Sequence, residues 1–254
     1  MIDVHCHIQQ KDYDSDRDEV IKECQKELKA VINSSPYFPN FGSAIDLHKK
    51  YPLFLFNALA IHPIYIEKMS ESTIKQAIDF LRENKELINA IGETGLDYYH
   101  IKNPASREKQ KEMFVEFIRL AKELDKTLLI HCRDAFDDCI SILEKEGMKD
   151  KKVVMHLFSS KEHIKNIIEN NWGISIGPSI MKSKDIKKIA RDMPLSNIML
   201  ETDSPWFGFG KRNTPLSIKQ VAAEIAEIKK ITFEGVWKGA GINAIKFFDL
   251  PIKI

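Results

Sequence analysis

The stretch Ile-Asp-Val-His-Cys-His, residues 2–7, decides the fold that we expect. Side chains alternate between the two faces of a strand, so Asp3, His5 and His7 are predicted to share one face. Two imidazoles two residues apart on an extended strand can reach one metal ion together. A pair of surface histidines near a chain end is the plain alternative, and a His-x-His motif by itself does not decide between the two.

Short apolar runs recur along the chain and are typical of buried parallel strands. Segments with helical periodicity lie between most of them, for example residues 113–124. This alternation predicts a (β/α)8 TIM-type barrel that forms a single domain over residues 1–254. A doubly wound open sheet is the alternative, and the chain lacks the Gly-x-Gly-x-x-Gly turn of that class. The predicted strands cover residues 2–5, 28–33, 54–61, 88–92, 127–131, 153–156, 173–177 and 197–200.

The composition of the chain excludes several classes of protein. Lys and Arg number 38 and Asp and Glu 37, which argues against non-specific coating of nucleic acid. The four cysteines form no Cys-x-x-Cys pair and indicate reduced thiols. We expect no signal peptide before the first strand, and the most apolar run, residues 53–61, is too short to cross a bilayer. We therefore expect a cytoplasmic protein with no membrane association and no obligatory protein partner.

Polar side chains stand where five of the predicted strands end. In a barrel these carboxyl ends converge on one mouth, where active sites of this fold are built. A lone histidine is more often a hydrogen-bonded structural residue. Four histidines and two carboxylates that meet at one mouth would be strongly unfavourable without a cation, and one or two divalent metals make them an ordinary ligand set. The six residues are His5, His7, Glu93, His131, His156 and Asp203.

Segments spread in order over nearly the whole chain resemble the TatD-like metal-dependent deoxyribonucleases, a branch of the amidohydrolase-like barrels. The combination of Gly-Glu-x-Gly-Leu-Asp with Glu-Thr-Asp-Ser-Pro is the most specific part of the resemblance. Gln9 stands where the family usually has an acidic residue and Ser160 where it usually has glycine, and neither is a predicted ligand. The matching segments are Asp3-Val4-His5-Cys6-His7, Ile61-His62-Pro63, Gly92-Glu93-Thr94-Gly95-Leu96-Asp97-Tyr98, His131-Cys132-Arg133, His156-Leu157-Phe158-Ser159, Glu201-Thr202-Asp203-Ser204-Pro205 and Arg212-Asn213-Thr214-Pro215.

The resemblance implies a hydrolase with two divalent metal ions and nucleic acid, above all DNA, as its substrate. Two cations about 3.5–4 Å apart suit hydrolysis of a phosphodiester. Asp203 is placed as the general base that orients the attacking water, and Glu93 as the bridge between the ions. Oxygen ligands favour Mg²⁺ or Mn²⁺ and four imidazoles favour Zn²⁺, so the metal stays open. By position, His5, His7 and Asp203 hold one ion, His131 and His156 hold the other, and Glu93 is shared.

Residues around the predicted ligands are candidates for contact with the substrate or with the ligands themselves. Asp3 and Glu201 share strand faces with ligands and are predicted to accept an N–H from a histidine, unless they only make structural hydrogen bonds in the barrel. Residues 204–213 mix aromatic, glycine and basic residues, as do loops that stack bases and hold phosphates. Packing, a loop turn or a surface salt bridge are the plain alternatives. The predicted substrate contacts are His62, Arg133, Trp206 and Arg212.

These inferences predict a two-metal phosphodiesterase of the TatD type that trims DNA ends, with RNA ends as a second substrate. An ester or carbon–nitrogen hydrolase, such as a deaminase or an aminoacyl-tRNA deacylase, is the alternative, because one fold hosts many reactions. Glu93 stands where classical deaminase and lactonase relatives would have a lysine available for carboxylation, which argues against them. A metal-stabilised binding protein without turnover ranks last, because all six ligands are present.

Overall fold

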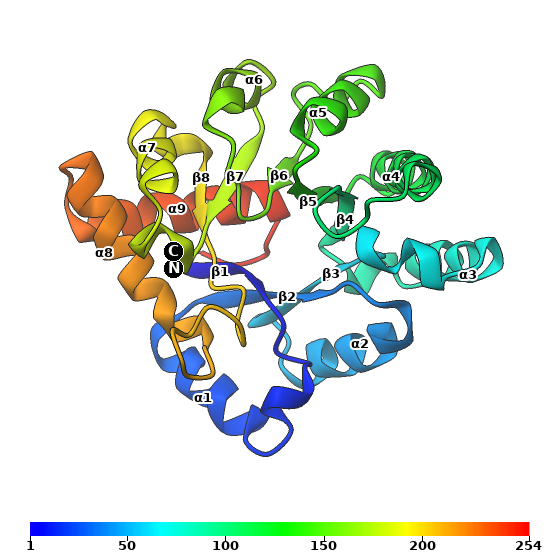
Figure 1. Ribbon diagram of the computed structural model, residues 1–254. Helices are drawn as coiled ribbons and strands as arrows, with labels where there is room; N and C mark the ends of the chain where they lie inside the picture. Colours follow the sequence, from blue (N-terminus) through cyan, green and yellow to red (C-terminus); the bar gives the residue numbers. More distant parts are fainter. Residues whose placement is uncertain (254) are drawn as a thin grey trace.

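The computed structural model describes residues 1–253 and contains one sheet of eight parallel strands in the order β1 to β8 (Figure 1). The backbone N–H of His7 donates to the carbonyl of Ser204 at 2.8 Å, and that of Asp203 donates to the carbonyl of His5 at 2.9 Å. These bonds join the segment after the last strand to the first strand, so the sheet is nearly closed. The predicted barrel is confirmed, and the open sheet is wrong.

The strands are short and the helices stand outside them. The strands are β1 Ile2–Cys6, β2 Ala30–Ser35, β3 Leu55–Leu59, β4 Ala90–Asp97, β5 Thr127–Arg133, β6 Val153–Met155, β7 Gly173–Ile176 and β8 Ile198–Leu200. The α-helices are α1 Arg17–Glu27, α2 Phe41–Lys50, α3 Glu71–Glu83, α4 Pro104–Glu123, α5 Phe136–Lys145, α6 Ile164–Glu169, α7 Lys184–Asp192, α8 Ile218–Lys229 and α9 Phe233–Phe248. Within residues 1–253, none of these helices has the length and apolar character that a membrane span needs.

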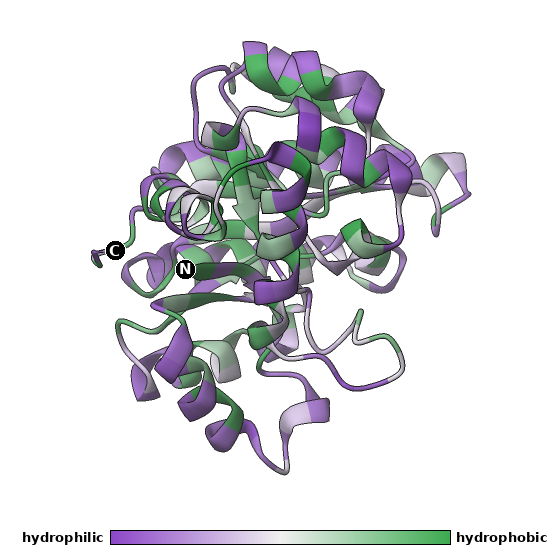
Figure 2. Ribbon diagram, turned by 90° about the vertical axis from the view of Figure 1, so that its left-hand side faces the viewer, coloured by the Kyte–Doolittle hydropathy of each residue, from purple (hydrophilic) through white to green (hydrophobic). Residues whose placement is uncertain are grey.

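Two hydrophobic clusters occupy the two faces of the sheet. The outer cluster fills the space between strands and helices, and Figure 2 shows hydrophilic residues concentrated on the outer helices and loops. The inner cluster lies inside the barrel and includes Val4, Leu129 and Met199 with Phe247 and Phe248 from α9. The inside of the barrel is apolar toward the amino ends of the strands and polar toward their carboxyl ends. The side chains that can bind a metal or a substrate are therefore confined to one end of the barrel.

Strict alternation along β1, as predicted from the sequence, is wrong. The pairing of β1 with β2 changes register between Asp3 and Cys6. Val4 therefore lies in the inner cluster with Ile2, whereas Cys6 lies in the outer cluster. An irregularity of this kind changes the direction of side chains, and here both Val4 and His5 lie on the inside of the barrel.

Strands β4 and β5 extend beyond their predicted ends, so Glu93, predicted to follow its strand, and His131, predicted to be the last residue of its strand, both lie within strands. The register between β4 and β5 shifts from Gly92 to Thr94, which leaves Glu93 out of the regular pairing. A Cβ atom on Gly92 would lie 2.5 Å from the Cβ of Leu129, so only glycine permits this approach. The close contact before Glu93 fixes where its carboxylate enters the barrel.

Candidate metal centre

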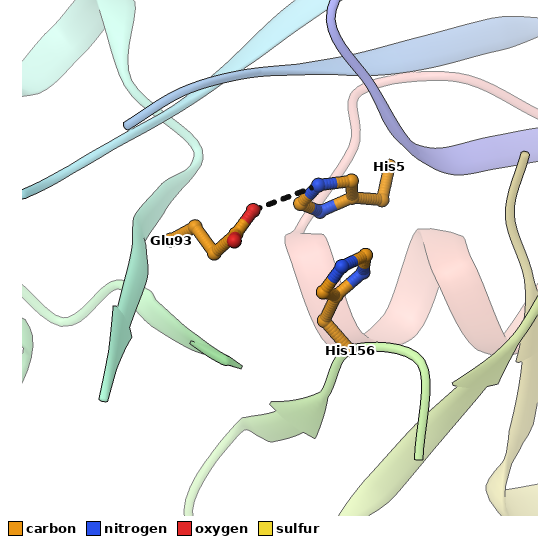
Figure 3. A group of neighbouring side chains, drawn as sticks. All are labelled: His5, Glu93 and His156. Atoms are coloured by element: carbon orange, nitrogen blue, oxygen red, sulfur yellow. Dashed lines mark ion pairs between the residues drawn. The ribbon is translucent and has the colours of Figure 1, made fainter. Parts of the chain in front are cut away.

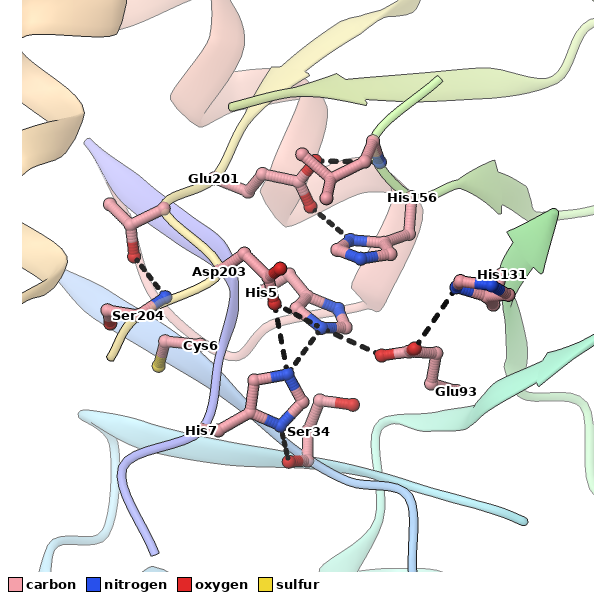
Figure 4. A network of polar contacts seen from close by, with 12 residues as sticks. His5, Cys6, His7, Ser34, Glu93, His131, His156, Glu201, Asp203 and Ser204 are labelled. Carbon is pink, nitrogen blue, oxygen red and sulfur yellow. Dashed lines mark hydrogen bonds and ion pairs between the residues drawn. The ribbon is translucent and has the colours of Figure 1, made fainter. Parts of the chain in front are cut away.

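The six predicted metal ligands meet at the carboxyl end of the barrel (Figure 4). They come from five positions around the ring: His5 and His7 at the end of β1, Glu93 in β4, His131 in β5, His156 after β6 and Asp203 after β8. All are buried except His131, which is partly buried. Residues separated by up to 198 positions in the chain therefore form one polar cluster above the inner hydrophobic cluster.

His5 stands at the centre of the first group of ligand atoms. Its Nε2 lies 2.9 Å from Oε2 of Glu93, 3.0 Å from Nε2 of His7 and 3.5 Å from Oδ1 of Asp203. The Nε2 of His7 lies 3.1 Å from the same oxygen of Asp203. His5, His7 and Asp203 thus present three ligand atoms within 4.8 Å of one another.

The hydrogen bond of His7 tests whether this group fits a cation. Nδ1 of His7 lies 2.8 Å from the carbonyl oxygen of Ser34, which can only accept, so Nδ1 carries the proton. In the neutral ring Nε2 then has a lone pair, and it faces an oxygen of Asp203 that is also an acceptor. Two acceptors 3.1 Å apart repel each other, and a cation between them turns that repulsion into two ligand bonds. The donor set fits a divalent metal.

Glu201 orients His156 in the same way. Its Oε2 accepts from Nδ1 of His156 at 2.6 Å, and its Oε1 accepts from the backbone N–H of Leu157 at 2.7 Å. Both carboxylate oxygens are therefore engaged, Nδ1 of His156 is the nitrogen that donates to Glu201, and Nε2 is left as the nitrogen that a metal ion would bind. Burial lowers the pKa of His156, but the carboxylates of Glu201 and Glu93 outweigh it and raise that pKa to about 10. The surrounding carboxylates therefore favour a positive charge at this position.

Asp97 orients His131 and was not predicted to do so. Its Oδ2 accepts from Nε2 of His131 at 3.0 Å, which leaves Nδ1 of His131 facing Glu93 at 3.5 Å. His100 closes the far side, since its backbone N–H and its Nδ1 both lie within 2.8 Å of the Asp97 carboxylate. The sequence carried a signal for this residue, because Asp97 ends the Gly-Glu-x-Gly-Leu-Asp motif and shares a strand with Glu93.

Predicted as a substrate contact, His62 lies directly beside Glu93. Its Nδ1 accepts from the backbone N–H of Ile64 at 3.1 Å, so Nε2 carries the proton and donates to Oε1 of Glu93 at 3.0 Å. Burial and the neighbouring His131 lower the pKa of His62 to about 4, which keeps the ring neutral. His62 is near enough to Glu93 and His131 to complete a ligand group, but its tautomer makes it a hydrogen-bond donor.

Glu93 belongs to two groups of ligand atoms at once. One contains His5, Glu93 and His156, with the rings of His5 and His156 stacked at 3.6 Å between centroids (Figure 3). The other contains His62, Glu93 and His131. The ring centroids of His131 and His156 are 6.4 Å apart, and these two predicted partners lie in separate groups that share Glu93.

Both carboxylates of the cluster are ionised. Burial raises the pKa of Glu93, but His5 and His62 outweigh it and hold that pKa well below its usual range. Burial likewise raises the pKa of Asp203, but the neighbouring His7 and His156 outweigh it and lower that pKa. The cluster therefore presents negative oxygens and ring nitrogens, the chemistry that binds a divalent cation.

Asp3, the other predicted partner of the ligands, contacts backbone and not a histidine ring. Its Oδ1 accepts from the backbone N–H of His5 and of Thr202, each at 3.1 Å, and its Oδ2 accepts from the hydroxyl of Thr202. Burial raises the pKa of Asp3 well above its usual range. Asp3 thus fastens β1 to the segment after β8, which sets the distance between His5 and Asp203.

The other predicted substrate contacts lie at a strand end or on loops around the mouth. The Trp206 ring meets His7 edge-on, with 4.6 Å between centroids, and the guanidinium carbon of Arg133 lies 3.8 Å from the centroid of the Tyr99 ring.

Arg212 donates to both carboxylate oxygens of Asp16, at 2.7 and 2.5 Å, and to the backbone carbonyl of Asp12. Its guanidinium also lies over the ring of Tyr13. It therefore holds the loop after β8 against the loop after β1, and its contact with substrate stays a prediction.

Known proteins match this chain along its whole length. The family model described as TatD related DNase matches residues 2–249. A protein of Bacillus subtilis named uncharacterized metal-dependent hydrolase YabD is 32% identical over 98% of this chain and 99% of its own. The human deoxyribonuclease TATDN3 is 31% identical over 98% of this chain and 94% of its own.

Solved structures agree with the fold. The crystal structure of YjjV, a TatD homologue from Escherichia coli, has a TM-score of 0.89 and 24% identity, and it covers 99% of this chain and 98% of its own. A TatD family hydrolase from Entamoeba histolytica has a TM-score of 0.90 and 20% identity, over 98% of this chain and 97% of its own. Because the family model and two relatives above 30% identity span almost every residue, this chain belongs to the TatD family of metal-dependent hydrolases.

Proposed function

We propose that this metal-dependent hydrolase is a phosphodiesterase that removes nucleotides from DNA ends, with RNA ends as a second substrate. The observation that carries the proposal is the convergence of four imidazoles and two ionised carboxylates from five positions around one barrel mouth. The relative named deoxyribonuclease TATDN3 supports DNA as the substrate. A phosphodiester is a negatively charged group, so it suits a site that gathers cations.

We further propose that the site holds two divalent ions. His5, His7 and Asp203 would hold one ion, His131 and His156 the other, and Glu93 would be shared. The two oxygens of Glu93 support the sharing, because Oε2 faces His5 and Oε1 faces His131. Divalent cations bound there would supply positive charge to a phosphodiester and acidify water. Mg²⁺, Mn²⁺ and Zn²⁺ are all compatible with mixed imidazole and carboxylate ligands.

Asp203 is the residue that we assign to proton transfer. Its carboxylate is ionised, lies at the mouth after β8, and has one oxygen turned toward His5 and His7. In that state it can accept a proton from the attacking water. Glu93 would hold the bound ions in place from β4. We propose Asp203 and Glu93 as the catalytic residues.

We propose that His62 contacts the substrate from the β3 side, because its ring lies beside Glu93 at the centre of the mouth. Arg133 and Trp206 are proposed as further contacts on the β5 and β8 sides, and Arg212 as a contact at the outer edge of the β8 loop.

The experiment that tests the function is cleavage of end-labelled single-stranded DNA with Mg²⁺, Mn²⁺ or Zn²⁺, with and without a chelator. We expect progressive shortening that the chelator abolishes and that Asp203→Asn reduces by two orders of magnitude or more. Asp46→Asn changes an exposed carboxylate on α2 in the same way and serves as the matched control.

Three other results would each reject this function. Hydrolysis of a carboxylic ester or an aminoacyl-tRNA without DNA cleavage would assign the site to an ester hydrolase. Release of ammonia from an amine-bearing substrate would assign it to a deaminase. Bound metal without turnover of any of these substrates would indicate a binding protein.

Two broader properties complete the proposal. All four cysteines are free, which supports a reducing compartment and hence a cytoplasmic location. A single domain over residues 1–254 is supported by the one eight-stranded sheet and by the family match over residues 2–249.

A further inference from the structure

Large aromatic side chains remain exposed on the loops that follow two ligand-bearing strands. Tyr99, two residues beyond β4, is 49% exposed, and Phe209, in the loop after β8, is 48% exposed. Trp206 and Phe207 of the same loop are also exposed. Single exposed apolar residues are normal on a protein surface, but these four lie on just two loops, each of which follows a strand near predicted ligands.

In each of the two loops, a cation from a neighbouring segment lies over an aromatic ring. The guanidinium carbon of Arg133, the last residue of β5, lies 3.8 Å from the centroid of the Tyr99 ring. The Nζ of Lys182, just after the segment Pro178–Met181 that follows β7, lies 4.3 Å from the centroid of the Phe209 ring. We call Tyr99 with Arg133 the Tyr99 platform, and Phe209 with Lys182 the Phe209 platform. Each combines a flat apolar ring with a positive charge.

The two platforms lie at separate places around the barrel mouth. The Tyr99 platform joins the loop after β4 to the end of β5, and the Phe209 platform joins the loop after β8 to the segment after β7, so β6 separates them on the shorter side of the ring. Asp97, two residues before Tyr99, bonds to His131. Trp206, three residues before Phe209, has its ring 4.6 Å from that of His7. Each platform therefore adjoins a different half of the ligand set.

We propose that the Tyr99 and Phe209 platforms stack the bases on the two sides of the cleaved bond of a single-stranded nucleic acid, an inference that rests on the proposed phosphodiesterase function. Every base has a flat face, so stacking on aromatic rings accepts any sequence. The cations at each ring neutralise the phosphates of the same nucleotides. The bases of a duplex stack on one another and are not free to stack on these rings. An acidic protein segment offers negative charge but no regular series of flat rings. Neither ligand therefore matches the two platforms.

A binding experiment tests the platforms without catalysis. Metal-stripped protein at low salt is titrated into a labelled ten-nucleotide single strand and into the same backbone without bases, and fluorescence anisotropy gives each Kd. We expect Tyr99→Ala and Phe209→Ala each to raise the Kd for the base-bearing strand by about 5- to 100-fold. Neither should change the Kd for the abasic strand. Equal affinity of the wild-type protein for the two strands would overturn the proposal.

Two control variants separate stacking from folding. Tyr99→Phe keeps the ring and is expected to bind like the wild type. Ile242→Ala removes an exposed apolar side chain from α9, away from both loops, and is expected to have no effect. A loss of binding in Ile242→Ala equal to that in the platform variants would overturn the assignment to Tyr99 and Phe209.

A cleavage experiment tests the two-sided arrangement. Metal-loaded enzyme is given strands with one abasic site on one or the other side of the cleaved bond. The loss caused by Tyr99→Ala should disappear with one placement and the loss caused by Phe209→Ala with the other. If both losses disappear with the same placement, the two-sided arrangement is wrong. If no strand is cleaved at all, the phosphodiesterase function fails, and the binding experiment still decides whether the platforms bind bases.

Discussion

Replacing Glu201 by glutamine changes one charge beside the candidate metal centre and leaves the size of the side chain unchanged. The backbone N–H of Leu157 needs an acceptor, so the amide oxygen must face Leu157, as Oε1 of Glu201 does now at 2.7 Å. The amide nitrogen then takes the place of the carboxylate oxygen Oε2, which lies 2.6 Å from Nδ1 of His156. Because the amide nitrogen of the glutamine donates a hydrogen bond, Nδ1 of His156 must accept it. The neutral His156 ring then carries its proton on Nε2.

The expected consequence is loss of one metal ligand without loss of its side chain. Partners that orient a ligating histidine typically contribute 10- to 100-fold in metal affinity, about 1.4–2.8 kcal/mol. The upper half of that range is expected here, because Glu201 and His156 are both buried and water cannot restore the lost bond. Isothermal titration of the metal-free protein with Zn²⁺ or Mn²⁺ against a competing chelator measures the change.

Two controls test whether the weaker metal binding arises from the position of Glu201 and not from a folding defect. Far-ultraviolet circular dichroism of Glu201→Gln should match the wild type, so that weaker binding is not a folding defect. Glu162→Gln, at an exposed position in the segment that follows β6, should bind metal like the wild type. Metal affinity of Glu201→Gln within a factor of two of the wild type would refute the argument that Glu201 fixes the tautomer of His156.

Three further predictions concern the same architecture. Asp97→Asn should weaken metal binding through His131 by about 10-fold or more, measured by the same titration, because an amide can turn a donor toward Nε2. Gly92→Ala should lower the free energy of unfolding in urea by about 1–3 kcal/mol or more, since its Cβ would lie 2.5 Å from that of Leu129; an unchanged midpoint would contradict the close approach. Chelation of the bound metal should lower Tm in calorimetry by about 5–10 °C, because metal at 100 times its Kd stabilises the folded state by about 2.7 kcal/mol, and no shift would mean that metal does not bind the folded protein preferentially.

The sequence predicted the barrel because its strands are buried runs that alternate with amphipathic helices, a pattern that depends only on near neighbours in the chain. Helix α2, Phe41–Lys50, has a weaker helical pattern in the sequence. Only Phe41, Ala44 and Ile45 are buried in it, which leaves a short apolar stripe with three basic residues at its end. The irregularities in β1 and β4 were missed, because they arise from contacts with β2 and β5 that no local pattern records.

The candidate site was predicted in its residues but not in its hydrogen bonds. His5, His7 and Asp203 were expected together, and the structure brings their ligand atoms within 4.8 Å of one another. The tautomers of His62 and His131 depend on which backbone or carboxylate group each ring meets, and those partners come from the tertiary arrangement. A strand-end pattern therefore predicts which side chains gather, and it does not predict which nitrogen of each ring is free.

The metal content of the reconstituted protein tests the central claim most directly. The purified chain is stripped with a chelator, loaded with Zn²⁺ or Mn²⁺, desalted and measured by elemental analysis, beside a Glu93→Gln variant treated in the same way. Our account predicts about two tightly held ions per wild-type chain and a clear loss in the variant, because Glu93 faces both groups of ligands. Fewer than one ion per wild-type chain, or full occupancy without the Glu93 carboxylate, would contradict it.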